Sequence, residues 1–141
     1  MKDIRWKQRF ENYTTVFNML KTEIDNKEID SFTDLEQAGL AKNFELCFEL
    51  LWKTIKDYLQ FEGVEINISS PKNVLKLAAT SGLLQSMDVN GDILMLAHKA
   101  RNELVHIYDQ KIFQSTLADI KKTFLPEMLK VDNFFMVQAH D

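Results

Sequence analysis

The chain has 141 residues, of which 21 are acidic and 17 are basic, so its formal charge is −4 at neutral pH. This length predicts one domain over residues 1–141, and 45% hydrophobic with 27% charged residues is typical of a globular protein. A net acidic chain excludes a protein that coats nucleic acid through bulk charge. The single cysteine, Cys47, excludes an internal disulfide and a zinc site built from several cysteines.

The chain shows neither a membrane span nor an export signal. Its longest uninterrupted apolar run, Ile93 to Ala97, is far shorter than the roughly 20 residues that cross a bilayer. The first seven residues mix charges where a signal peptide carries an apolar segment. We therefore expect a cytoplasmic protein without membrane contact, in a reducing compartment.

Only four glycines and two prolines occur, which favours long helices and an all-α fold. Apolar residues recur every three or four positions from Ile4 to Ile24 and predict a first helix over residues 3–25. Residues 25–30 are polar and are interpreted as a solvated turn. A long second helix should follow and end at Gly63, which suits a left-handed C-cap.

Two capping boxes could start this second helix: Ser31 with Asp34, or Thr33 with Glu36. Its apolar stripe includes Phe44, Phe48 and Trp52 at helical spacing, so these rings should belong to the core, and Cys47 should be an inert buried thiol.

Residues 64–70 should form a loop, after which Ser70 and Pro71 start a short third helix that Gly82 closes. A fourth helix should begin at Asp88 or Asn90 and run through Leu104. The last helix should cover residues 111–137, with a kink at Pro126. The sequence thus predicts an antiparallel four-helix up-and-down bundle with one additional short helix.

Polar side chains crowd the end of the fourth helix. At 100° per residue, His98, Arg101, Asn102 and Val105 fall within about 100° of one another, and His106 lies one turn beyond Asn102. Arginine binds phosphate oxygens through a fork of donors, and histidine exchanges a proton near neutral pH. This combination suits RNA cleavage through the substrate's own 2′-hydroxyl, which needs no metal or cofactor.

One protomer supplies only part of such a site. His98 is a candidate second proton carrier, but we favour a homodimer that brings two copies of Arg101 and His106 together. Other interpretations stay open. Arg101 could form an ion pair with Glu103 or Asp109, and His106 could cap a helix C-terminus. A metal site at His98, Asn102 and His106 is disfavoured, because an amide is a poor ligand for transition metals and no carboxylate completes the set.

The segment from Arg101 to Tyr108, RNELVHIY, resembles the Arg-x4-His-x-Tyr motif of HEPN-domain proteins, in particular the nucleotidyltransferase substrate-binding proteins, or HepT-type toxins. The resemblance extends over nearly the whole chain. It includes residues 5–13, the block from Trp52 to Leu59 before Gly63, the Ser70-Pro71 pair and the Gly82-Leu83 pair.

The resemblance implies a homodimeric four-helix bundle and a minimal nucleotidyltransferase partner that acts as antitoxin to an RNase toxin. It implies that Arg101 binds phosphate, that His106 acts as acid or base, and that Asn102 orients His106 or the phosphate. It also makes Tyr108 the candidate site of adenylylation by the partner, which would fill the cleft and neutralise its charge.

Two functions therefore remain open. The first is a metal-independent endoribonuclease that acts as a homodimer. The second is a non-catalytic subunit that binds the substrate or nucleotide of a two-component nucleotidyltransferase. The acidic charge balance favours the second function, as does Val105, which stands where many relatives carry Ser or Thr before the histidine.

Overall fold

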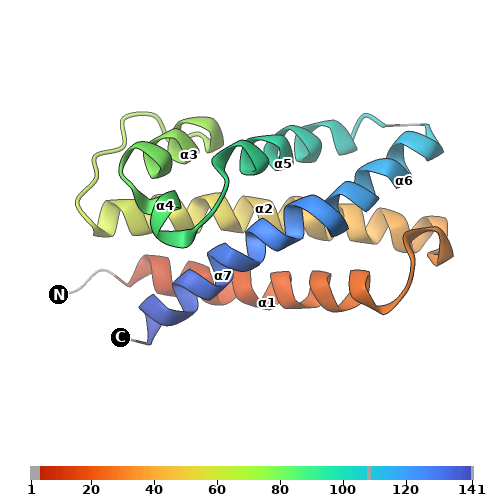
Figure 1. Cartoon of the computed structure of the whole chain (residues 1–141), viewed down its shortest axis with the longest axis horizontal. Coiled ribbons are helices and arrows are strands. Elements are labelled where there is room, and N and C mark those ends of the chain that lie inside the picture. The colour runs from red at the N-terminus through yellow and green to blue at the C-terminus, as the bar shows by residue number, and fades with distance from the viewer. Residues whose placement is uncertain (1–3, 108, 141) are drawn as a thin grey trace.

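The computed structural model describes residues 4–107 and 109–140, which contain helices and no strands (Figure 1). The elements in chain order are α1 (Arg5–Asn26), the 3-10 turn η1 (Ile29–Ser31), α2 (Asp34–Phe61), α3 (Pro71–Thr80), α4 (Leu83–Met87), α5 (Gly91–Leu104), α6 (Gln110–Asp119), the π-helical turn η2 (Ile120–Phe124) and α7 (Leu125–Ala139). The predicted all-α fold is confirmed.

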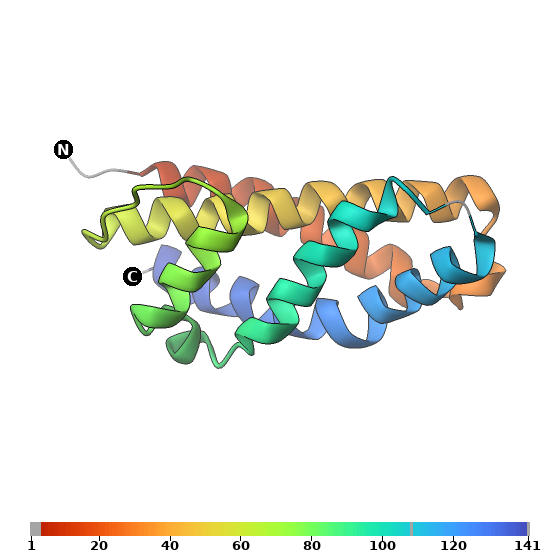
Figure 2. The ribbon, with the colours of Figure 1, turned by 90° about the horizontal axis from the view of Figure 1, so that it is seen from above.

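Four long helical segments alternate in direction along the bundle. α1 and α2 lie antiparallel, α5 returns along α2, and α6, η2 and α7 run back as one continuous helical segment (Figure 1). Seen from above, α5 crosses between α2 and the α6–α7 segment, and α3 lies beside both α2 and α5 (Figure 2). The predicted antiparallel bundle is confirmed, with α4 as a short helix that the sequence did not predict.

Local capping signals fix the two ends of α2. Of the two candidate capping boxes, the structure uses Thr33, whose hydroxyl accepts from the Glu36 N–H at 3.1 Å while the Glu36 carboxylate accepts from the Thr33 N–H at 2.9 Å. At the other end Gly63 adopts φ +90°, and the N–H of Val64 donates to the Leu59 carbonyl at 2.9 Å. This Schellman arrangement is the predicted left-handed C-cap.

α3 and α5 begin where side chains satisfy free backbone donors. Ser70 caps α3 with Pro71 in its first turn, as predicted. Asn90, not Asp88, caps α5 by accepting from the Asp92 N–H at 2.9 Å. Asp88 instead ends α4 with φ +59° in the left-handed region.

Two predicted segments need correction. Residues 25–30 are not wholly a solvated turn, because Ile29 is buried in η1, where the buried Gln37 side chain donates to its carbonyl at 3.2 Å. The last helix carries a π-helical turn directly before Pro126. Proline lacks an N–H and crowds the preceding turn, and the wider turn relieves this crowding. In place of a kink at Pro126 itself, the structure therefore has a π-helical turn that ends two residues before it.

The core is one cluster to which every helix contributes, and most of its aromatic rings come from α1, α2 and α7. Tyr13 of α1 is fully buried and donates its hydroxyl to the Met128 carbonyl of α7 at 2.8 Å. Phe44, Phe48 and Trp52 are buried as predicted. Cys47 is buried beside them, and burial raises the pKa of its thiol so strongly that the thiol stays protonated and inert.

Candidate functional site

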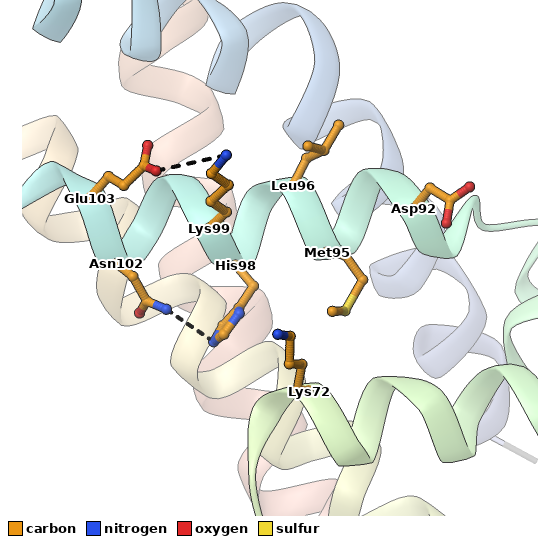
Figure 3. A pocket seen from close by; sticks show the side chains of 8 residues that line it. All are labelled: Lys72, Asp92, Met95, Leu96, His98, Lys99, Asn102 and Glu103. Atoms are coloured by element: carbon orange, nitrogen blue, oxygen red, sulfur yellow. Dashed lines mark hydrogen bonds and ion pairs between the residues drawn. The ribbon is translucent and has the colours of Figure 1, made fainter.

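Three of the predicted site residues form one chain of polar contacts on α5. Arg101 Nη1 donates to Asn102 Oδ1 at 3.2 Å, and Asn102 Nδ2 lies 3.4 Å from His98 Nε2. Figure 3 shows Asn102 and His98 on the side of α5 that faces α3. The helical spacing that predicted a shared polar face is therefore correct for these three residues.

Arg101 is held by a carboxylate of the neighbouring helix. Its Nη2 lies 2.9 Å from Glu49 Oε2, which also accepts from Trp52 Nε1 at 3.0 Å. Lys53 Nζ lies 3.0 Å from the other carboxylate oxygen of Glu49. Both expected alternatives for Arg101 are wrong, since Glu103 pairs with Lys99 instead and Asp109 caps α6.

The ion pair between Glu49 and Arg101 is partly accessible, with about a third of each side chain exposed (29% and 32%). Partial burial opposes ionisation of Glu49, but hydrogen bonds from Trp52 and Lys53 and the charges of Lys53 and Arg101 outweigh it and lower the pKa of this carboxyl. Glu49 is therefore ionised at neutral pH, and it neutralises much of the Arg101 charge.

His98 is held as a neutral imidazole. Its ring packs against Phe48 with centroids 5.9 Å apart. Partial burial lowers the pKa of His98, and the positive charges of Arg101 and Lys72 lower it further, whereas Glu49 opposes the shift. A neutral ring can accept the Asn102 amide hydrogen at Nε2 and still offer an N–H at Nδ1.

His106 lies two residues beyond the end of α5. α5 ends at Leu104, and the chain turns so that the His106 N–H donates to the Glu103 carbonyl at 2.9 Å. The projection of His106 one turn beyond Asn102 assumed helical geometry through residue 106, whereas α5 ends at Leu104. Its side chain is exposed and makes no hydrogen bond or ion pair within residues 4–107 and 109–140. Tyr108 lies outside the described residues.

A pocket of about 660 Å³ opens beside these residues, between α5 and the start of α3. Lys72 projects from α3 towards His98, while Met95, His98 and Asn102 face it from α5 (Figure 3). The remaining lining residues are Asp92, Leu96, Lys99 and Glu103. Its mixture of apolar and polar side chains and its volume are typical of small-molecule sites.

Sequence reasoning missed Glu49 and Lys72. Glu49 carried a local signal, because Trp52 and Lys53 follow it at helical spacing, but its contact with Arg101 joins residues 52 positions apart. Lys72 meets His98 through the packing of α3 on α5. Within the described ranges, no group of three or more His, Cys, Asp or Glu side chains is placed to hold a metal ion. None of the described helices is both long and apolar enough to span a bilayer.

A comparison with models of protein families identifies the family of this chain. The family model described as nucleotidyltransferase substrate binding protein like matches residues 8–136, which include all of α2, α3 and α5. A search of curated proteins finds no match. Because the match covers more than nine-tenths of the sequence and the whole candidate site, the chain belongs to the family of nucleotidyltransferase substrate binding protein like proteins, which has the HEPN-like fold.

Proposed function

We propose that this chain is the nucleotide-binding, non-catalytic subunit of a two-component nucleotidyltransferase and works with a minimal nucleotidyltransferase partner. The observation that carries the proposal is the 2.9 Å ion pair between Arg101 and Glu49. A phosphodiester-cleaving site needs a cation aimed at the developing negative charge. In this protomer the Glu49 carboxylate already pairs with the Arg101 guanidinium, so this cation is not free to stabilise a transition state, which favours the non-catalytic role.

The test is calorimetric titration of the purified chain with ATP, GTP, CTP and UTP in EDTA, followed by co-purification with a minimal nucleotidyltransferase. We expect binding of at least one nucleotide and a stable complex of the two proteins. The proposal is wrong if the chain binds neither a nucleotide nor the partner.

A second function, a homodimeric metal-independent endoribonuclease, is favoured by His106. Its imidazole is exposed and has no partner within the described ranges, so it is available to move a proton. In this reaction the 2′-oxygen attacks the neighbouring phosphorus as it gives up its proton, and the 5′-oxygen leaves with a proton from an acid. A homodimer would supply a second His106 as that acid, beside a second Arg101.

This second function is tested by incubating mixed RNA with the parent protein, His106→Ala, Arg101→Ala and His140→Ala in EDTA. His140 is an exposed histidine at the end of α7 and serves as the matched control. An endoribonuclease requires cleavage by the parent and the control and none by the other two variants. Cleavage by all four proteins would reveal a contaminating nuclease.

Tyr108 is the proposed modification site. With the partner and ATP present, adenylylation would join the tyrosine oxygen to the α-phosphorus of ATP and release pyrophosphate. Intact mass spectrometry of the parent and of Tyr108→Phe checks this, because only the parent should gain an adenylyl group.

A further inference from the structure

The groove between α3 and α5 gathers donors at one end. Lys72 approaches from the first turn of α3, and His98 and Asn102 face it from α5 (Figure 3). The Asn102 amide reaches His98 Nε2 at 3.4 Å and accepts from Arg101, so the groove is connected directly to the Arg101–Glu49 pair.

Lys72 is the cation of the groove that is available to a ligand, because the neighbouring cations are paired with carboxylates. Lys99 lies 4.0 Å from Glu103 on the same helix, and Arg101 is paired with Glu49. Lys72 is exposed and forms no ion pair or hydrogen bond with any residue in the described ranges. An ammonium group in such a position attracts an anion from solution.

We propose that this groove binds a nucleoside triphosphate, with its phosphates held by the Lys72 ammonium, the Asn102 amide and the His98 ring N–H, and its nucleoside against Met95. This proposal rests on the proposed nucleotide-binding function and locates the nucleotide site between α3 and α5.

The shape and lining of the groove favour a nucleotide over a free inorganic anion. Its volume of about 660 Å³ is far larger than a phosphate needs. Met95 and Leu96 give it an apolar wall. Asp92 lies six residues before His98, roughly 9 Å along the helix, and its carboxylate suits ribose hydroxyl donors. A cationic end for the phosphates, a carboxylate for the ribose and an apolar wall for the base match the three parts of a nucleotide.

His98 gives the proposal a spectroscopic signature. The charged groups around it are Arg101 and Lys72, which lower its pKa, and Glu49, which raises it. A phosphate bound at Lys72 adds negative charge beside the ring and should raise this pKa. The chain has three histidines, so the His98 signal in a proton NMR titration is identified by its loss in His98→Gln.

The first experiment measures ATP affinity in EDTA for the parent, Lys72→Ala, Lys72→Glu and Lys76→Ala. Lys76 is an exposed lysine one turn along α3 that does not line the groove, so it is the matched control. We expect affinity to fall roughly tenfold or more for Lys72→Glu, less for Lys72→Ala, and about twofold at most for Lys76→Ala. Equal ATP binding by the parent and Lys72→Glu would overturn the location of the site while leaving nucleotide binding itself intact.

The second experiment repeats the parent titration with tripolyphosphate and with adenosine. Weaker binding of each than of ATP supports a site that contacts both parts of the nucleotide, whereas tripolyphosphate binding as tightly as ATP overturns the nucleoside assignment. The third is the NMR titration with and without ATP, in which the His98 pKa should rise and the exposed His140 serves as internal reference. An unchanged His98 pKa would overturn its contact with phosphate.

Absence of any nucleotide binding by the parent would overturn both this site and the proposed nucleotide-binding function.

Discussion

Glu49 is the residue that determines what Arg101 can bind. It contacts Arg101, Trp52 and Lys53 at once, so its carboxylate is well ordered and ionised. An arginine that is paired in this way binds an added phosphate only in competition with the carboxylate. The affinity of the site for anions therefore depends on a residue outside the Arg-x4-His-x-Tyr motif.

Glu49→Gln should strengthen ATP binding by up to about fivefold, because it removes a negative charge close to the groove that binds the phosphates. The amide oxygen can still accept from Trp52, so the free energy of unfolding should change by less than about 1 kcal/mol, as is usual for partly exposed pairs. The same variant should lower the pKa of His98 further, since Glu49 is the charge that raises it. Calorimetry, thermal denaturation and NMR titration measure these three effects.

Glu45→Gln is the control for this variant, because Glu45 lies one turn earlier on α2 and pairs with the exposed Lys42 at 3.5 Å, away from Arg101. It should leave ATP affinity and the His98 pKa unchanged. A Glu49→Gln protein with weaker ATP binding would show that the carboxylate positions the chain of contacts from Arg101 through Asn102 to His98 for the ligand.

Asp132 on α7 is a buried carboxyl with an incomplete set of partners. Only 6% of the residue is exposed, and Oδ1 has no hydrogen bond within the described part of the chain. Burial raises the pKa of Asp132, and a hydrogen bond from Thr14 lowers it by less. Folding therefore shifts the protonation equilibrium of Asp132 towards the protonated form.

Asp132→Asn should stabilise the fold at pH 7 by about 1 kcal/mol, because it removes a buried charge without changing shape. With its pKa raised on folding, native Asp132 keeps a proton that the unfolded chain releases. Its contribution to stability is thus most favourable below about pH 4 and declines as pH rises through the native pKa. Denaturation of parent and variant across pH 4 to 8 should show a difference that grows with pH.

Asp57→Asn is the contrasting variant. Asp57 is equally buried but pairs with Arg9 Nε at 2.9 Å, so its replacement should destabilise the protein by about 2 kcal/mol. If Asp132→Asn destabilised the protein to the same extent, both oxygens of the Asp132 carboxylate would have to be hydrogen-bonded in the native protein.

The sequence predicted those site residues that share one helix and missed those that meet across helices. His98, Arg101 and Asn102 follow from spacing alone, because α5 keeps its helical geometry through all three. Glu49 and Lys72 depend on the packing of α2 and α3 against α5, which no local pattern encodes. His106 is a third case, since it lies beyond the end of α5 and helical spacing places side chains only within a helix.

At the scale of elements, the sequence predicted the ends of helices where the backbone geometry requires a particular residue type. Gly63 ends α2 because its φ of +90° excludes most side chains, and Ser70 with Pro71 starts α3 because both suit a helix N-terminus. α4 escaped prediction because it is bounded by an aspartate, Asp88, in the left-handed region, which aspartate adopts only occasionally.

Two glycines, one inside α2 and one just beyond its end, should respond in opposite ways to alanine. Gly63→Ala should destabilise the protein by about 1 to 2 kcal/mol, through conformation alone, since a Cβ there meets nothing within 4 Å. Gly39→Ala should stabilise it by about 0.5 to 1 kcal/mol, because Gly39 lies inside the helix and also has open space around it. Chemical denaturation measures both, and a loss of stability at Gly39 would indicate a neighbour that the single chain does not show.

At the scale of the whole molecule, exposed apolar side chains flank the Arg101–Glu49 pair. Leu46 lies one turn before Glu49 on α2 and is 48% exposed, and Val105 directly follows α5 and is 58% exposed. Each is an ordinary surface residue alone, but together beside a half-complete site they suit contact with a second copy of the chain.

We therefore expect the protein to be a homodimer in solution, with a light-scattering mass near twice 16.5 kDa at micromolar concentration. Leu46→Glu should give a monomer, because it introduces an unpaired charge into the expected interface. Leu35→Glu is the matched control: Leu35 is 84% exposed at the start of the same helix, three turns from Leu46. A monomeric parent would remove the structural basis for a shared RNase site, while nucleotide binding in the α3–α5 groove, which uses one protomer only, would stand.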